Sequence, residues 1–164
     1  MSEDIRLNWN EAVRIDWGTI LLFGSGIALG TLLSETGLAE TIGEGLTKGL
    51  GVSSLFAITI LSTIVALLIS ETTSNTASAT IVVPIVLPIA ASAGVNPVIP
   101  ALAAVFGASY GFMLPVSTPP NAIVYGSGMI PITKMIRSSI VFDLIGIVLI
   151  TFGISVMARL VGLA

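Results

Sequence analysis

The chain has 164 residues, of which 54% are hydrophobic and 9% charged, whereas soluble domains carry charge on about a quarter of their residues. It contains neither cysteine nor histidine, which excludes thiolate and imidazole metal sites, cysteine nucleophiles and histidine-based triads. The net charge of −3 is spread over the ends and loops, without a basic stripe for nucleic acid. We therefore expect an all-α, multi-pass integral protein of the cell (inner) membrane that is not an enzyme.

The first third of the chain predicts one span between two polar segments. Residues 1–16 are polar with mixed charge, which predicts a cytoplasmic lead-in. Residues 17–34 nearly reach the roughly 20 residues that a helix needs to cross a bilayer, and Trp17 suits the interface. Residues 35–51 carry three acids, one lysine and five glycines, which predicts an extracytoplasmic loop with a short amphipathic helix.

Residues 52–93 consist of two apolar arms that flank the polar stretch SETTSNT at 70–76. In one interpretation the arms are two ordinary spans joined by a turn in water. In the other they form a re-entrant hairpin whose tip stops near the middle of the membrane. Polar backbone at that depth occurs only where it is buried in protein or lines a cavity. The second interpretation therefore implies a binding site.

The apolar stretch at 97–130 is interrupted at 115–121 by the sequence PVSTPPN. Adjacent prolines remove backbone donors and prevent a continuous helix, so we expect a discontinuous helix here. We expect residues 131–137 to form a cytoplasmic loop or a short surface helix and 138–158 a last transmembrane span. The positive-inside rule supports this orientation, because the basic residues that flank the spans lie in the two places assigned to the cytoplasm: Arg6, Arg14, Lys134 and Arg137.

Two polar interruptions are the features that indicate function. The SETTSNT stretch offers hydroxyls, an amide and free backbone groups, which suit a sodium ion and a carboxylate together. The same residues also suit a polar turn between helices, and the second interruption alone would be a simple proline kink. Paired interrupted segments are typical of a transporter's binding site, so together they favour a functional site.

Two acidic residues lie in the predicted membrane segments. Glu71 is a candidate proton relay or direct ligand, or else a structural acceptor for the hairpin's own backbone donors, which we prefer. We expect Asp143 near the cytoplasmic interface, paired with Lys134 or Arg137. Gly107 and Gly111 are spaced to give a small-residue face for close helix contact.

Three stretches resemble the C-terminal half of the divalent anion/sodium symporter family: SETTSNTASATIVVPI at 70–85, MLPVSTPPNAIVYGSG at 113–128 and IDWGTILLFGSGIALG at 15–30. The resemblance implies an elevator-type transporter built from two inverted repeats, each with a re-entrant helical hairpin that bears an SNT motif. This chain has one such motif, so it would be the C-terminal inverted repeat. The implied partners are a dicarboxylate anion, membrane lipid, the missing N-terminal repeat and a second copy in a homodimer of the complete carrier.

The resemblance also implies the site residues. Na+, the coupling ion, would be surrounded by residues of both interruptions, several through backbone carbonyls: Ser70, Thr73, Ser74, Asn75, Ser117 and Pro119. The dicarboxylate would be faced by Asn75, Thr76 and Thr118. Position 117 is serine where the family often has alanine, which adds a hydroxyl beside the proposed sodium site.

The sequence thus predicts sodium-coupled secondary transport of small dicarboxylates, C4 acids such as succinate, with this chain as the C-terminal half of the carrier. Two alternatives stay open. One is an anion exchanger or proton-coupled carrier of related organic or inorganic anions. The other is an inactive membrane fragment with a structural role only.

Overall fold

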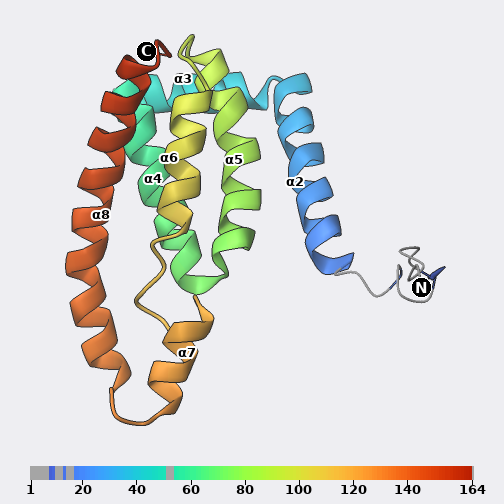
Figure 1. Ribbon diagram of the computed structural model, residues 1–164. Coiled ribbons are helices and arrows are strands. Elements are labelled where there is room, and N and C mark those ends of the chain that lie inside the picture. Colours follow the sequence, from blue (N-terminus) through green and yellow to red (C-terminus); the bar gives the residue numbers. More distant parts are fainter. Residues whose placement is uncertain (1–7, 10–12, 14–16, 51–53, 164) are drawn as a thin grey trace, which may run out of the picture.

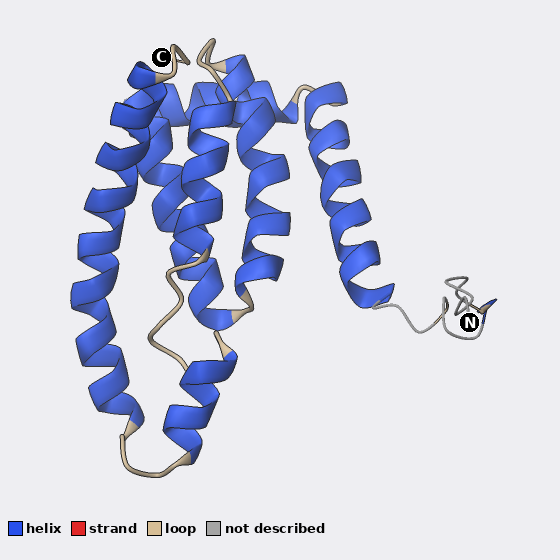
Figure 2. Ribbon diagram, in the orientation of Figure 1, coloured by secondary structure: helices blue, strands red, loops and turns tan. Residues whose placement is uncertain are grey.

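The computed structural model describes residues 8–9, 13, 17–50 and 54–163, and every regular element among them is a helix (Figure 2). The helices are α2 (Trp17–Glu35), α3 (Leu38–Leu50), α4 (Leu55–Thr72), α5 (Asn75–Ser92), α6 (Val98–Ala108), α7 (Pro119–Gly126) and α8 (Ile132–Leu160). Three of them, α4, α5 and α8, are long and apolar enough to cross a membrane. These are the elements of an integral membrane protein, as the composition predicts. The predicted lead-in at 1–16 lies almost wholly outside the described residues.

The helices α4, α5 and α6 form the centre of the bundle (Figure 1). α8 packs along one side of this centre, against α4 and α6, and α2 packs on the other side against α5. α3 crosses one end of the bundle, where it contacts α2 and α5. α7 lies at the opposite end, beyond the tip of the α4–α5 pair.

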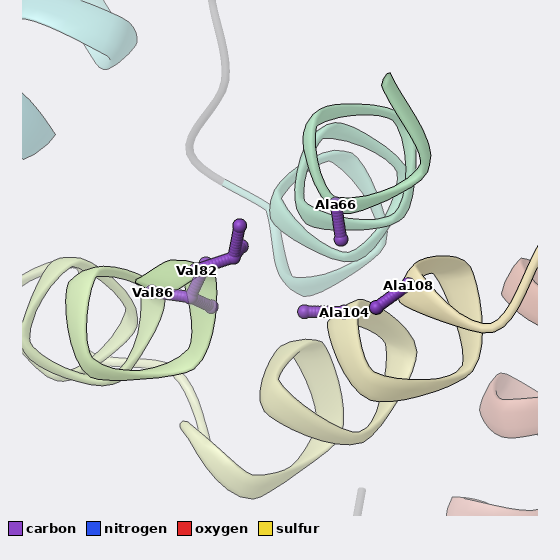
Figure 3. Packing of buried hydrophobic residues seen from close by; sticks show 5 residues of the cluster. All are labelled: Ala66, Val82, Val86, Ala104 and Ala108. Carbon is purple, nitrogen blue, oxygen red and sulfur yellow. The ribbon is translucent and has the colours of Figure 1, made fainter. Parts of the chain in front are cut away.

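Small side chains allow the three central helices to approach one another closely. Figure 3 shows the core where they meet, which consists of Ala66, Val82, Val86, Ala104 and Ala108. A Cβ atom at Gly107 of α6 would lie 2.6 Å from the Thr63 carbonyl oxygen of α4, so these two backbones are in direct contact. Close packing of small residues is a main source of helix association in lipid, where burial of apolar surface contributes little.

The α4–α5 pair is a tight antiparallel hairpin. Only Thr73 and Ser74 separate the two helices, and the Ser74 hydroxyl caps α5 by accepting from the Ala77 N–H at 3.1 Å. The buried Ser78 hydroxyl of α5 donates to the Ala66 carbonyl of α4 at 2.6 Å and joins the two arms. The polar SETTSNT stretch is therefore mostly helical, with a break of two residues.

The second interruption is wider than the sequence predicts and starts earlier. α6 ends at Ala108 rather than near Leu114, and the chain stays non-helical as far as Thr118. α7 then begins at Pro119, followed by Pro120. Proline is favoured at the first helical positions, because its missing N–H would have no partner there. The two prolines therefore start α7 instead of breaking α6.

The prediction that residues 131–137 form a loop or a short helix separate from the last span is wrong, because α8 begins at Ile132 and continues to Leu160. Pro131 precedes the helix in an extended conformation, with φ −71° and ψ 147°. No proline follows within α8, so nothing in the sequence ends the helix between the basic residues and the apolar stretch at 138–158.

Candidate functional site

The two helix interruptions meet at a buried junction. Ser117 is 3% exposed, and its Oγ lies 2.9 Å from the Ser70 carbonyl oxygen and 2.8 Å from that of Gly111. The fully buried Ser70 hydroxyl contacts Asn75 Oδ1 at 2.8 Å and also the carbonyl oxygen of Ala108. The junction therefore joins the last turn of α4, the start of α5, the end of α6 and the residue two before α7.

Acceptor oxygens outnumber protons at this junction. The acceptors are Ser70 O, Asn75 Oδ1, Ala108 O and Gly111 O. Each serine hydroxyl supplies one proton, and Asn121 Nδ2 supplies one more to Gly111 O at 3.2 Å. Three protons thus serve four acceptors, and a buried acceptor without a donor costs about 1–3 kcal/mol. A small, hard cation prefers such oxygen ligands and would remove this deficit.

Gly111 is a junction residue that sequence reasoning missed. We expected it to continue the helix contact made by Gly107, but it lies beyond the end of α6. A Cβ atom here would overlap the Ser117 hydroxyl and would lie 2.8 Å from Ser70 Oγ. A glycine four residues before a polar break is a signal for such a close approach, because a residue without a Cβ atom lets other groups reach its backbone.

Glu71 holds the segment between α6 and α7 in place. Its carboxylate is 4% exposed and accepts from two successive backbone N–H groups, Phe112 to Oε1 at 3.0 Å and Met113 to Oε2 at 2.8 Å. Charge-assisted bonds of this kind are stronger than neutral ones. Glu71 is thus a backbone acceptor, as we preferred, but its donors belong to the interrupted segment and not to the hairpin.

Three of the predicted sodium-site residues lie at the junction: Ser70, Asn75 and Ser117. The other three are close to it in the chain but make other contacts. The Thr73 hydroxyl donates to the Ile69 carbonyl at 2.8 Å, and the Ser74 hydroxyl caps α5. Pro119 is exposed as the first residue of α7.

The predicted substrate residues lie at the starts of two helices. Asn75 is the first residue of α5 and Thr76 the second, and Thr76 is exposed. Thr118 caps α7 by accepting from the Asn121 N–H at 3.4 Å. α7 begins just beyond the hairpin tip (Figure 1). Helix N-termini carry partial positive charge, so two of them near one junction favour an anion.

Asp143 does not form the predicted pair with Lys134 or Arg137. Its side chain is 4% exposed, on the face of α8 that is buried against the bundle, and neither carboxylate oxygen accepts a hydrogen bond. The ion pair found in the described part of the chain joins Lys48 and Glu44 of α3 at 2.7 Å. The prediction is wrong because Asp143 faces the bundle, whereas both basic residues are exposed.

Comparison with known proteins identifies the family. The family model described as "Sodium:sulfate symporter transmembrane region" matches residues 5–163. The sodium-dependent dicarboxylate transporter SdcS of Staphylococcus saprophyticus subsp. saprophyticus is 42% identical over 144 residues, which is 88% of this chain and 28% of that protein. SdcS of Staphylococcus aureus strain USA300 shows the same identity and coverage. The chain thus spans about 28% of the length of these curated relatives. Because the family model covers nearly all of it, the chain belongs to the sodium:sulfate symporter family of membrane transporters.

Proposed function

We propose that this chain is the part of a sodium-coupled dicarboxylate carrier that binds Na+ where the α4–α5 hairpin meets the α6–α7 interruption. The observation that carries the proposal is the junction in which three protons serve four acceptor oxygens, three of them backbone carbonyls of buried residues. Carbonyl groups at unwound helix segments are typical sodium ligands of transporters. The relatives named as sodium-dependent dicarboxylate transporters support the same ion.

In this proposal Na+ lies between the carbonyl oxygens of Ser70 and Gly111, where the Ser117 proton now lies. The Ser117 hydroxyl then turns its proton away, and its oxygen becomes a ligand together with Asn75 Oδ1. Glu71, next to Ser70 in the chain, supplies the negative charge that a buried cation requires. Thr73, Ser74 and Pro119 would line the approach to the ion from the hairpin tip.

We further propose that the junction lies at membrane depth, in a re-entrant hairpin of an elevator-type carrier. α8 has 29 residues and is about 43 Å long, more than the hydrocarbon core of about 30 Å. The hairpin tip ends at a level between the middle of α8 and its N-terminal end, and α7 continues beyond it (Figure 1). A polar tip at that depth requires burial in protein, and Ser70 and Ser117 are buried. This favours a hairpin over two spans joined in water.

The proposed substrate is a C4 dicarboxylate such as succinate. One carboxylate would bind Asn75, Thr76 and Thr118 between the N-termini of α5 and α7, where helix dipoles favour an anion. The chain spans 28% of its relatives, so the second carboxylate would be bound by the rest of the carrier. We propose that the rest of the carrier includes an N-terminal repeat. We also propose that the complete carrier is a homodimer in the inner membrane.

Binding of labelled succinate tests the proposal. The chain is placed in lipid nanodiscs, alone or co-expressed with the N-terminal portion of a family member, in sodium or choline buffer. We expect binding only with both portions and sodium, and a lower sodium affinity in Ser117→Ala, which removes a proposed ligand oxygen and leaves the carbonyl ligands in place. Ser92→Ala is the matched control, because Ser92 lies on the same hairpin but bonds only within α5. Equal binding in choline would refute sodium coupling, and pH-dependent uptake without sodium would favour the proton-coupled alternative.

A further inference from the structure

The face of α8 that packs on α4 and α6 holds a carboxylate that the proposed transport site does not use. Asp143 is 4% exposed, and neither of its oxygens accepts a hydrogen bond. Two turns further along α8, the hydroxyl of Thr151 is also buried without a partner. A buried carboxylate is strongly unfavourable unless it is paired, bound to a cation or neutralised. Asp143 therefore needs a compensating charge.

The elements around Asp143 offer no positive charge. α8 packs against α4 and α6. The titratable residue of α4 is Glu71, an acid whose two oxygens already bind backbone N–H groups. α6 has no titratable residue, and in the segment after it the Tyr110 ring packs against Gly146, one turn from Asp143. On α8 itself, Lys134 and Arg137 are exposed.

The compensating charge must also be small. Both carboxylate oxygens are sealed from solvent, so a lysine side chain from another part of a carrier does not reach them in this packing. A monovalent cation without its water shell is the species that fits.

We propose that Asp143 is a second cation-binding residue of this chain, which takes one monovalent cation, H+ or Na+, at a site separate from the Ser70–Ser117 junction. The cation neutralises Asp143 on α8, which packs against α4, the helix that carries Glu71. Because Glu71 holds the Phe112 and Met113 N–H groups, the charge at Asp143 acts on the residue that shapes the junction.

Infrared difference spectroscopy of the 164-residue chain in nanodiscs tests this. Two exchanges are made, a pH change in choline buffer and a replacement of choline by sodium at constant pH. The wild-type chain should lose a protonated carboxyl band as the pH rises, if the cation is H+, or show a sodium-dependent shift of a carboxylate band, if it is Na+. Asp143→Asn should lack this response, whereas Ser139→Ala on the same face of α8 should retain it.

Identical wild-type and Asp143→Asn spectra in both exchanges would overturn the proposal. A chain in which Asp4 and Asp16 are replaced by asparagine and the remaining aspartate is 13C-labelled assigns the band to an intact Asp143, so the test does not depend on the folding of Asp143→Asn. Asn75→Ala separates this site from the proposed function, because it should weaken the junction and leave the Asp143 response unchanged. If Asn75→Ala loses sodium binding at the junction and also the infrared response of Asp143, there is one site and not two.

Discussion

Replacing Gly111 with alanine adds one methyl group where the proposed sodium ligands converge. The new Cβ would overlap the Ser117 hydroxyl and would lie 2.8 Å from Ser70 Oγ and 3.0 Å from Ser70 O. Ser117 would have to leave, with the loss of contacts at 2.8 and 2.9 Å. Overpacking costs about 1–3 kcal/mol and each lost hydrogen bond about 0.5–1.5 kcal/mol. If about 3 kcal/mol of this free-energy cost must be overcome when sodium binds, sodium affinity decreases about 100-fold.

The assay is the sodium-dependent rise in the melting temperature of the chain in nanodiscs, measured over a sodium titration in choline at constant ionic strength. Gly111→Ala should move the midpoint to about 100-fold higher sodium or abolish the rise. Gly153→Ala is the matched control, because a Cβ there meets nothing within 4 Å, and its titration should match the wild type. A wild-type titration in Gly111→Ala would refute the assignment of the junction as the cation site.

Three further substitutions separate the junction from the packing around it. Glu71→Gln replaces one acceptor oxygen by an NH2 group that faces a backbone N–H, so it should cost about 1.5–3 kcal/mol and lower sodium affinity at least tenfold, with unchanged helicity by circular dichroism. Ser78→Ala removes the bond between the hairpin arms; we expect a loss of about 1 kcal/mol in thermal unfolding and an unchanged sodium midpoint. Gly107→Ala would place a Cβ 2.6 Å from Thr63 O, so unfolding should show a loss of about 1–3 kcal/mol, and a stability equal to that of Gly153→Ala would contradict the close α4–α6 contact.

The membrane character of the fold was predictable because it depends on long runs of apolar residues. Those runs give α4, α5 and α8 their length and hydropathy. The hairpin tip was predictable in outline, since Ser74 is a strong N-cap residue between two apolar arms. The start of α8 was not, because Pro131 can end one segment or begin the next, and the choice depends on the backbone that follows.

The junction depends on contacts that sequence patterns do not encode. Ser117 and Ser70 are 47 positions apart, and Glu71 finds its donors 41 and 42 positions away. Such contacts are fixed by how α6 packs on α4, and α6 ends early because its final carbonyl, that of Ala108, is capped by the Ser70 hydroxyl. The missing partner of Asp143 was equally invisible, because periodicity shows that a residue faces a bundle but not what it meets there.

The proposed position of the two interruptions at membrane depth would also account for the proposed site. Water does not reach the backbone at membrane depth, so each break must satisfy its own N–H and C=O groups with protein atoms. Here Glu71 satisfies the freed N–H groups with a carboxylate, while the freed carbonyls have only the protons of Ser70, Ser117 and Asn121. The freed N–H groups thus face a carboxylate charge, and the freed carbonyls have fewer protons than acceptor oxygens. A cation at the proposed junction site would balance the charge of Glu71 and supply the missing partner of the carbonyls.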